Sequence, residues 1–496
     1  MNHRVLLGTA ACLLLAGCAL QQPPFGANIM PEKARAQIPG SWSGSHRSGS
    51  VVPNWIRTFN DPELTALVAD AVARNPDLIA AAARVEASRA AVRIAAASLY
   101  PRIAMKGLGE RQGQELSGDL GRSINPPDLG PPGTENPGGA GLDTSMDSSS
   151  QRWVYGLAAG ASWEADVWGR IRSRKAAARA ESGALEADYE FARQSLAAAV
   201  ARAYFTTIEA AQQEANAQET LSLYQEYSKL TEQKKEQGFA SDFDVSQIKS
   251  RTAAAEDALY TAQAARAQTI RAIEVVTSRY PAGRFNVRRS FPAQPKAVPA
   301  GLPAEILERR PDIVAAERRF AASFHRVTEA RTARLPRIVL SATGGLGTAE
   351  LDGVGTLDAV IWSLAAGITQ PIFFGGELKA AQDLRTYEQQ AAAATYVGTA
   401  LRAFEDVEDA LAGDYYLRKR EGALSDAVSS SAESITFGRS QLEQGQIDMF
   451  TTLRLAGENL AAKVQLTSVR ASRLRERVNL YLALGGDFEG TGAPGK

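Results

Sequence analysis

The side chains that most often carry out chemistry are rare in this sequence. Its 496 residues include only two cysteines, Cys12 and Cys18, and three histidines. Only His325 lies beyond the first 50 residues, and one histidine makes neither a catalytic triad nor a zinc site. The sequence has no P-loop, no GxGxxG motif between a strand and a helix, and no paired C-x-x-C. We therefore expect no enzyme, no metal and no bound cofactor.

Cys18 is the one residue placed for a modification. The chain begins MNHRVLLGTAACLLLAGCAL, with Arg4 ahead of a short apolar run. This pattern predicts a secretory signal peptide at residues 1–17. The run ends in Leu-Ala-Gly-Cys, which resembles the bacterial lipobox, and this resemblance implies cleavage before Cys18 and a covalent lipid on it. Ala19 in the next position implies the outer membrane. The alternative is that Cys18 is an ordinary cysteine of the apolar run.

The charges are balanced, with 55 Lys and Arg against 55 Asp and Glu. No excess of positive charge is available to attract nucleic acid. No run of 18 apolar residues occurs, so no transmembrane helix is predicted. A chain that is targeted to a membrane is then either attached only by its covalent lipid or inserted as a β-barrel.

Very long helices dominate the predicted elements. Residues of about 170–237 contain no proline and one interior glycine, which predicts a helix ~100 Å long. Further helices are expected at about 241–279, 376–444 and 448–485, each pair separated by a glycine-containing break. Helices of this length are stable only when they pack along one another.

Four strands complete the predicted elements. Alternation of apolar and polar residues predicts strands at about 101–108, 153–168, 336–345 and 357–374. Four strands with an apolar face cannot close a channel-sized barrel, whereas three copies of the chain would supply twelve strands. The aromatic residues of these strands suit the two interfaces of a membrane. A soluble hairpin packed on helices is the alternative interpretation.

The order of elements occurs twice. Residues 75–103 and 310–338 are identical at 12 of 29 positions without a gap, and both segments end in Pro-Arg-Ile. We expect a lipidated N-terminal arm at residues 18–60 and a first repeat at 61–285. A linker at 286–303, a second repeat at 304–488 and a tail at 489–496 follow.

Three segments resemble a known family. RRPDIVAAERRF with the following LPRI, WEADVWGRIR (Trp163 to Arg172) and QPIFFGGELKA (Gln370 to Ala380) are similar to segments of the TolC-like outer membrane factors. The resemblance is to the outer-membrane efflux proteins and, among them, to the NodT/OprM-like lipoproteins. It implies an α+β membrane protein: a homotrimer with a 12-strand outer-membrane β-barrel continuous with a long α-helical periplasmic barrel.

The same resemblance implies function and partners. It suggests a passive duct for drugs and small toxic molecules, supplied by an inner-membrane RND transporter through a periplasmic adaptor (membrane fusion protein). A type I protein-secretion exit duct is one alternative. The other is a lipid-anchored periplasmic coiled-coil scaffold or adaptor that never inserts.

In the family, the two helix breaks form the periplasmic tips, where the tunnel narrows and meets the adaptor. The corresponding residues here are Gly238, Ser241, Asp242, Asp244, Gly445, Asp448, Thr451 and Arg454. The glycines fit left-handed C′ positions, and Ser241 or Asp242, and Asp448, fit helix N-caps. Asp244 and its neighbours either line the closed aperture or only cap a helix. Thr451 and Arg454 stand where the family often has aspartate.

One acidic run is a candidate for the lumen. Its members are Glu405, Asp406, Glu408 and Asp409. These carboxylates either line the duct and favour cations or form a solvated helix face.

Overall fold

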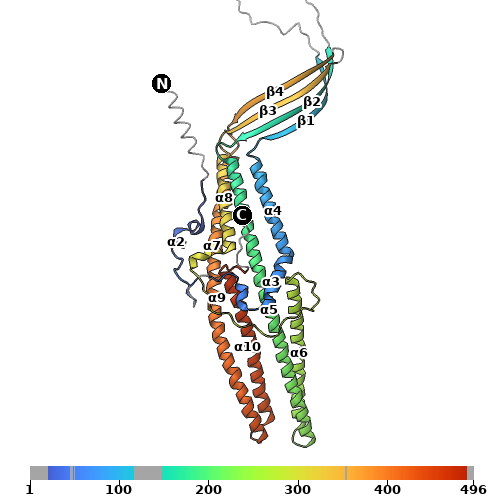
Figure 1. Cartoon of the computed structure of the whole chain (residues 1–496), viewed down its shortest axis with the longest axis vertical. Coiled ribbons are helices and arrows are strands. Elements are labelled where there is room, and N and C mark those ends of the chain that lie inside the picture. The colour runs from blue at the N-terminus through green and yellow to red at the C-terminus, as the bar shows by residue number, and fades with distance from the viewer. Residues whose placement is uncertain (1–20, 45–48, 50, 117–147, 352–354, 489–496) are drawn as a thin grey trace, which may run out of the picture. The chain divides into compact units, whose positions relative to one another are not determined.

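The computed structural model describes residues 21–44, 49, 51–116, 148–351 and 355–488 (Figure 1). Most of these residues are helical, and the remainder include one four-stranded antiparallel sheet. The signal peptide, Cys18 and the tail at 489–496 lie outside the described residues. None of the helices in the described part of the chain is both long enough and apolar enough to cross a membrane.

The duplication is visible in the lengths of the helices. Helices α4 (Pro76–Ala97) and α8 (Pro311–Thr332) each have 22 residues, and α5 (Arg170–Glu236) and α9 (Glu377–Glu443) each have 67. The partners α6 (Asp242–Val276) and α10 (Met449–Ala483) each have 35. Corresponding helices of the two repeats therefore match residue for residue in length.

The compact units of the molecule do not follow the two repeats. One unit contains the sheet and the chain around it, within 93–175 and 327–383; the other lies within 22–92, 176–326 and 384–496. Each repeat contributes to both units, because strands of both repeats hydrogen-bond into one sheet. The repeats are thus a duplication of sequence and are not separate compact domains.

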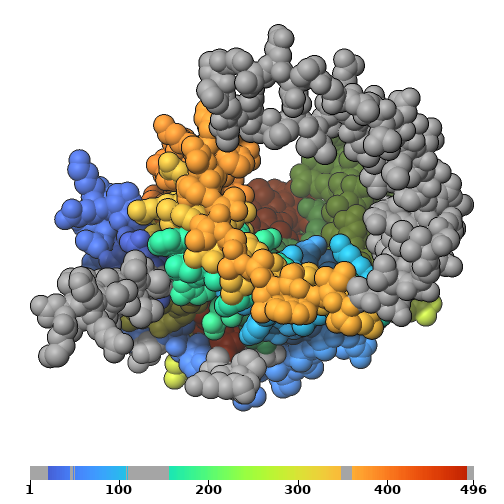
Figure 2. Space-filling view, turned by 90° about the horizontal axis from the view of Figure 1, so that it is seen from above, coloured from blue at the N-terminus to red at the C-terminus, as the bar shows by residue number. Residues whose placement is uncertain are grey.

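The sheet has the strand order β1-β2-β3-β4, with β1 and β4 at its edges. The strands are β1 (Arg102–Leu116), β2 (Ser148–Ala165), β3 (Arg337–Leu351) and β4 (Gly355–Thr369). Their antiparallel register pairs Arg102 with Ser162, and Glu164 with Val339. Side chains of β3 and β4 can be followed in orange on the molecular surface (Figure 2).

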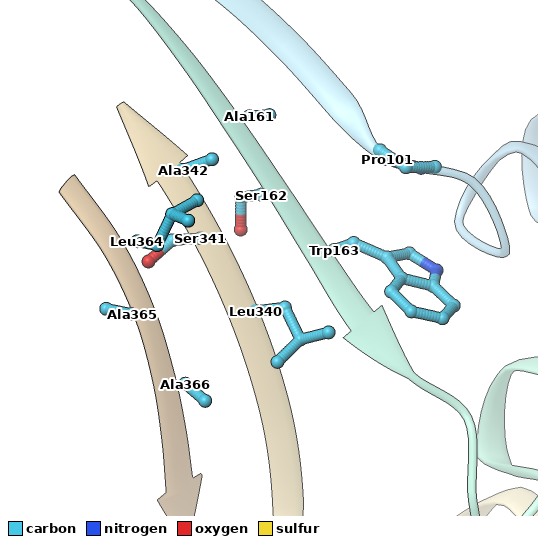
Figure 3. A pocket seen from close by; sticks show the side chains of 10 residues that line it. All are labelled: Pro101, Ala161, Ser162, Trp163, Leu340, Ser341, Ala342, Leu364, Ala365 and Ala366. Atoms are coloured by element: carbon cyan, nitrogen blue, oxygen red, sulfur yellow. The ribbon is translucent and has the colours of Figure 1, made fainter. Parts of the chain in front are cut away.

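The pairing gives the sheet one apolar and one polar face, because successive side chains point to opposite sides. The apolar face carries Ile103, Met105, Leu157, Trp163, Leu340, Leu346, Trp362, Leu364 and Ile368. The polar face carries Arg102, Lys106, Ser162, Glu164, Arg337, Ser341, Thr343, Ser363 and Thr369, with Val339 and Ile361 as apolar exceptions. A pocket of about 450 Å³ on the apolar face is lined by residues that include Trp163, Leu340 and Leu364 (Figure 3).

The predicted strand ends were wrong in several places. Strands β1 and β3 extend to Leu116 and Leu351, beyond the expected 108 and 345, because backbone pairing continues past the apolar pattern. Strand β2 begins at Ser148 and ends at Ala165, three residues before the expected end. Strand β4 ends at Thr369 and does not reach residue 374, and Pro371, which lacks a backbone N–H, follows it.

The helix ends differ less from the expectation. The second long helix, α6, ends at Val276 and not near 279, and Ser278 just beyond it has a left-handed φ of 59°. Helix α3 (Pro62–Arg74) begins with Asp61 as N-cap, whose carboxylate accepts from the backbone N–H groups of Glu63 and Leu64.

The N-terminal arm has local structure in its described part. The described arm contains the short helical turns η1 (Gly26–Ile29), α2 (Glu32–Arg35) and η2 (Trp55–Phe59). It buries Trp42, Trp55 and Phe59 among the helices, because these large apolar side chains gain free energy by leaving water.

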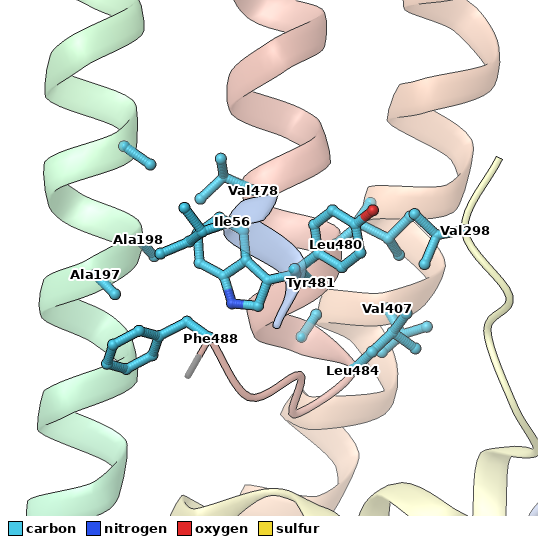
Figure 4. Close-up of a cluster of buried hydrophobic side chains, with 14 of the residues drawn as sticks. Ile56, Ala197, Ala198, Val298, Val407, Val478, Leu480, Tyr481, Leu484 and Phe488 are labelled. Atoms are coloured by element: carbon cyan, nitrogen blue, oxygen red, sulfur yellow. The ribbon is translucent and has the colours of Figure 1, made fainter. Parts of the chain in front are cut away.

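One hydrophobic core joins the arm to both repeats. Trp55 of the arm stacks on Tyr481 of α10, with ring centroids 5.6 Å apart and planes inclined by 15°. Around this pair pack apolar residues of α5, α9, α10 and the linker, including Ala198, Val407 and Val298 (Figure 4). Elements that are distant in sequence therefore depend on one another for burial.

Candidate functional site

The first helix break is a tight turn fixed at both ends. Gly238 has φ of 82°, a conformation that favours glycine, and its N–H donates to the Lys235 carbonyl at 2.9 Å. The Phe239 N–H donates to the Lys234 carbonyl at 2.8 Å, so α5 ends in a Schellman motif. Ser241 and Asp244 then form a capping box at the start of α6.

The capping box decides between the two candidate N-caps. The Ser241 N–H donates to Asp244 Oδ2 at 2.8 Å, and the Asp244 N–H donates to Ser241 Oγ at 3.2 Å. Asp242 is not the cap, because its carboxylate forms an ion pair with Lys235 across the turn.

The second break repeats this geometry. Gly445 has φ of 72°, and the N–H groups of Gly445 and Gln446 donate to carbonyls in the last turn of α9. Asp448 caps α10: the Thr451 N–H donates to Asp448 Oδ1 at 2.8 Å, and the Thr451 hydroxyl to Oδ2 at 3.0 Å. Arg454 forms an ion pair with Glu458 one turn further on, at 2.7 Å.

The carboxylates of both breaks are stabilised in their charged form. Hydrogen bonds from Ser241 lower the pKa of Asp244 below its ordinary value, and Lys235 lowers the pKa of Asp242. The Thr451 backbone N–H lowers the pKa of Asp448 in the same way. All three side chains therefore carry negative charge at neutral pH.

A small apolar cluster connects the two helical hairpins near their breaks. It contains Tyr227 of α5, Ile248 of α6, and Met449 and Leu453 of α10. By contrast, Phe239 at the first break is 80% exposed, and Phe243 one turn later is 72% exposed. The first break thus combines a hydrogen-bonded backbone turn with acidic and aromatic side chains open to solvent.

Two members of the acidic run hold other parts of the chain. Asp406 receives a hydrogen bond of 2.9 Å from Nη1 of Arg310, a residue that is only 6% exposed. Arg310 also forms an ion pair with Asp312 at 2.8 Å. Glu408 accepts from the backbone N–H groups of Ser43 and Gly44 in the arm, at 2.7 and 2.9 Å.

The other two members hold no such partner among the described residues. Asp409 lines a cavity of about 310 Å³ together with Arg310, Asp406 and Glu476. Burial raises the pKa of Glu476 above its ordinary value, and the nearby carboxylates of Asp414 and Asp409 act in the same direction. Glu405 is exposed and makes no hydrogen bond or ion pair with any described residue. A role in the lumen stays a prediction for this run.

The contact between the N-terminal arm and α9 was not predicted from the sequence. Trp42 donates from Nε1 to the Ala300 carbonyl at 3.2 Å, and its ring centroid lies 6.2 Å from that of Phe404. A Cβ atom on Gly44 would lie 2.7 Å from Cβ of Leu411, so only glycine fits at this distance from the helix. A tryptophan two residues before a glycine in a Ser/Gly-rich arm was the only available signal.

Comparison with known proteins identifies the family. The family model described as "Outer membrane efflux protein" matches residues 67–278 and 302–486. The toluene efflux pump outer membrane protein TtgI of Pseudomonas putida is 31% identical over 490 residues, covering 96% of this chain and 97% of TtgI. Outer membrane protein OprJ of Pseudomonas aeruginosa is 30% identical, with 92% of each chain covered.

The chain belongs to the outer membrane efflux protein family.

A solved structure of the outer-membrane channel OprN agrees with this assignment. Its TM-score is 0.77 at 27% sequence identity, and the match covers 95% of this chain and 98% of OprN. As an outer membrane efflux protein, the chain is the channel component of an efflux system, located in the outer membrane of a Gram-negative bacterium. The family consists of efflux channels and is not an enzyme family. A scaffold or adaptor that never inserts is therefore no longer a competing interpretation.

Proposed function

We propose that three copies of this outer membrane efflux protein form a duct for small toxic molecules across the outer membrane and the periplasm. The sheet supports this proposal most directly. It has one apolar and one polar face, and its edge strands β1 and β4 are not paired within the described part of the chain.

A sheet of this kind is unstable alone in lipid, because its edge N–H and C=O groups have no partners there. Joining β1 of one copy to β4 of the next satisfies both edges. Three copies then give a closed barrel of twelve strands, within the range of known outer-membrane barrels. The apolar face lies against lipid, and the polar face borders the duct.

The long helical hairpins extend the duct in this proposal. Their breaks at Gly238 and Gly445 form the periplasmic tips, at which the adaptor docks. An RND transporter of the inner membrane supplies the substrate. The exposed Phe239 and Phe243 lie near Asp244 of the capping box and Asp242, which pairs with Lys235, and offer the adaptor an apolar and acidic surface.

At the same tips, Asp244 and Arg454 are the candidates for an electrostatic constriction. Their charges differ in sign, and Arg454 is exposed while Asp244 is partly exposed. A covalent lipid on Cys18, which precedes the described arm in the sequence, anchors each copy to the outer membrane. The sequence around Cys18 supports this anchor. The packing of the arm on the helices also supports it, because the arm connects the lipidated residue to the folded part of the chain.

The proposed substrates are small apolar or amphiphilic toxic compounds. The relative TtgI is named for the efflux of toluene, and this chain matches it over nearly its whole length. No specific contact among the described residues favours a protein substrate.

A deletion strain tests the proposed function. We expect at least a fourfold lower inhibitory concentration of toluene or of amphiphilic antibiotics, restored by the wild-type gene. The reason is that export through the duct lowers the concentration of these compounds inside the cell. Complementation with Cys18→Ser should restore resistance only in part, with less protein in the outer membrane. Unchanged sensitivity to every compound, in a strain without other efflux channels, would argue against a small-molecule duct.

A further inference from the structure

A polar cavity of about 250 Å³ lies on the polar face of the sheet, where β2 leads into α5. Three arginines from two segments line it: Arg102 at the start of β1, and Arg170 and Arg174 in the first turns of α5. The hydroxyls of Ser98 and Ser162 and the carboxylate of Glu164 also line it. The cavity therefore holds three positive charges and one negative charge.

The single carboxylate pairs with one of the three arginines. Arg170 donates from Nη2 to both oxygens of Glu164, at 2.9 and 2.8 Å, and from Nε to Oε1 at 3.1 Å. Both side chains are half-buried, so this pair is a fixed part of the wall. Glu164 accepts no hydrogen bond from Arg102 or Arg174 in the described structure.

Arg102 and Arg174 have no acidic partner among the described residues. Arg102 makes one long hydrogen bond, 3.4 Å from Nη2 to Ser98 Oγ, and Arg174 makes none. Arg170 and Arg174 lie one turn apart on α5, a spacing at which like charges repel. An arrangement that gathers cations without counter-ions is suited to an anion from outside the chain.

The end of helix α5 is not itself the binding site. Two of its free N–H groups are already occupied, because Asp166 accepts from the Ile171 and Arg172 N–H groups at 2.9 and 2.8 Å. The guanidinium groups of Arg102 and Arg174 are exposed to solvent and have no acidic partner among the described residues.

We propose that this cavity binds an oxyanion group, a phosphate or a carboxylate, of a solute that passes along the polar face of the sheet. Guanidinium groups match such oxygens in pairs, through parallel N–H donors. The inference rests on the proposed function, because the polar face borders a duct only when the apolar face lies against lipid. A lipid phosphate has the same chemistry, but lipid would cover the opposite, apolar face.

The test is block of single-channel current by inorganic phosphate. The full-length lipidated protein is placed in planar bilayers of phosphatidylcholine with potassium chloride on both sides, and phosphate is added. We expect a saturable fall in current. In the double variant Arg102→Gln/Arg174→Gln, half-block should need roughly tenfold more phosphate, as expected for the loss of charge-assisted hydrogen bonds.

Lys106→Gln is the matched control, since Lys106 lies on the same face of the sheet and does not line the cavity. It removes one positive charge and should leave the block nearly unchanged. Equal loss of block in Lys106→Gln would show diffuse attraction and would overturn the site. If the glutamine variants fail to assemble, Arg102→Lys/Arg174→Lys keeps the charges but not the paired donors, and should weaken the block severalfold.

Two further outcomes separate the inference from the proposed function. A wild-type channel that conducts but is not blocked by phosphate contradicts the anion site and leaves the duct intact. A wild-type protein that never conducts contradicts the duct itself. Finally, adding phosphatidylglycerol to the bilayer should not relieve the block; relief would show that a lipid headgroup occupies the cavity and would overturn the solute assignment.

Discussion

Single residues at the two breaks determine where one helix ends, how the chain turns and where the next helix begins. Gly238 and Gly445 allow the left-handed turn, and Ser241 and Asp448 satisfy the N–H groups that begin the next helix. The type of each residue follows from the local backbone. These positions could therefore be predicted from the sequence. The choice between Ser241 and Asp242 as the N-cap could not, because it depends on where Lys235 lies.

At the residue scale, Asp448→Ala should loosen the start of α10. Loss of an N-cap typically costs about 1 kcal/mol, so the Thr451 amide should exchange its hydrogen about fivefold faster. Hydrogen–deuterium exchange with mass spectrometry measures this effect. Asp448→Asn is the control, since asparagine caps helices as well as aspartate does, and it should exchange like the wild type. Faster exchange in both variants would mean that the negative charge matters more than the cap.

At the scale of elements, the long helices could be placed from sequence and the strand ends could not. The helices α5 and α9 lack proline and end at glycine breaks, which are local signals. The strands β1 and β3 are extended by pairing with neighbours, and no local pattern records that pairing. The three arginines of the polar cavity were missed for the same reason, because Arg102 meets Arg170 and Arg174 only through the sheet.

One carboxylate of α9 holds a short stretch of the arm through hydrogen bonds. In Glu408→Gln, the side chain can accept from only one of the Ser43 and Gly44 N–H groups and opposes the other with its own NH₂ group. We expect a loss of about 1.5 kcal/mol and hence roughly tenfold faster hydrogen exchange at these two amides. Glu405→Gln, in the same acidic run but without a partner among the described residues, should change neither amide. Equal exchange in all three proteins would show that the hydrogen bonds of Glu408 do not hold this part of the arm.

At the scale of the whole molecule, the duplication has a structural reason. Each repeat supplies two strands and one pair of long helices, and the strands of both repeats share one sheet. Because the corresponding helices are equal in length, three chains would provide six nearly equivalent units around one axis in the proposed assembly. The sequence pattern indicated this repetition, while membership in the outer membrane efflux protein family came from comparison with whole relatives.

The most direct test of the account is single-channel recording of the purified, lipidated protein in planar lipid bilayers. The account predicts discrete, uniform conductance steps, each from one closed barrel of three chains. An assembled, membrane-inserted protein that gives no steps at any voltage or salt concentration would contradict the claim that the chain forms a duct.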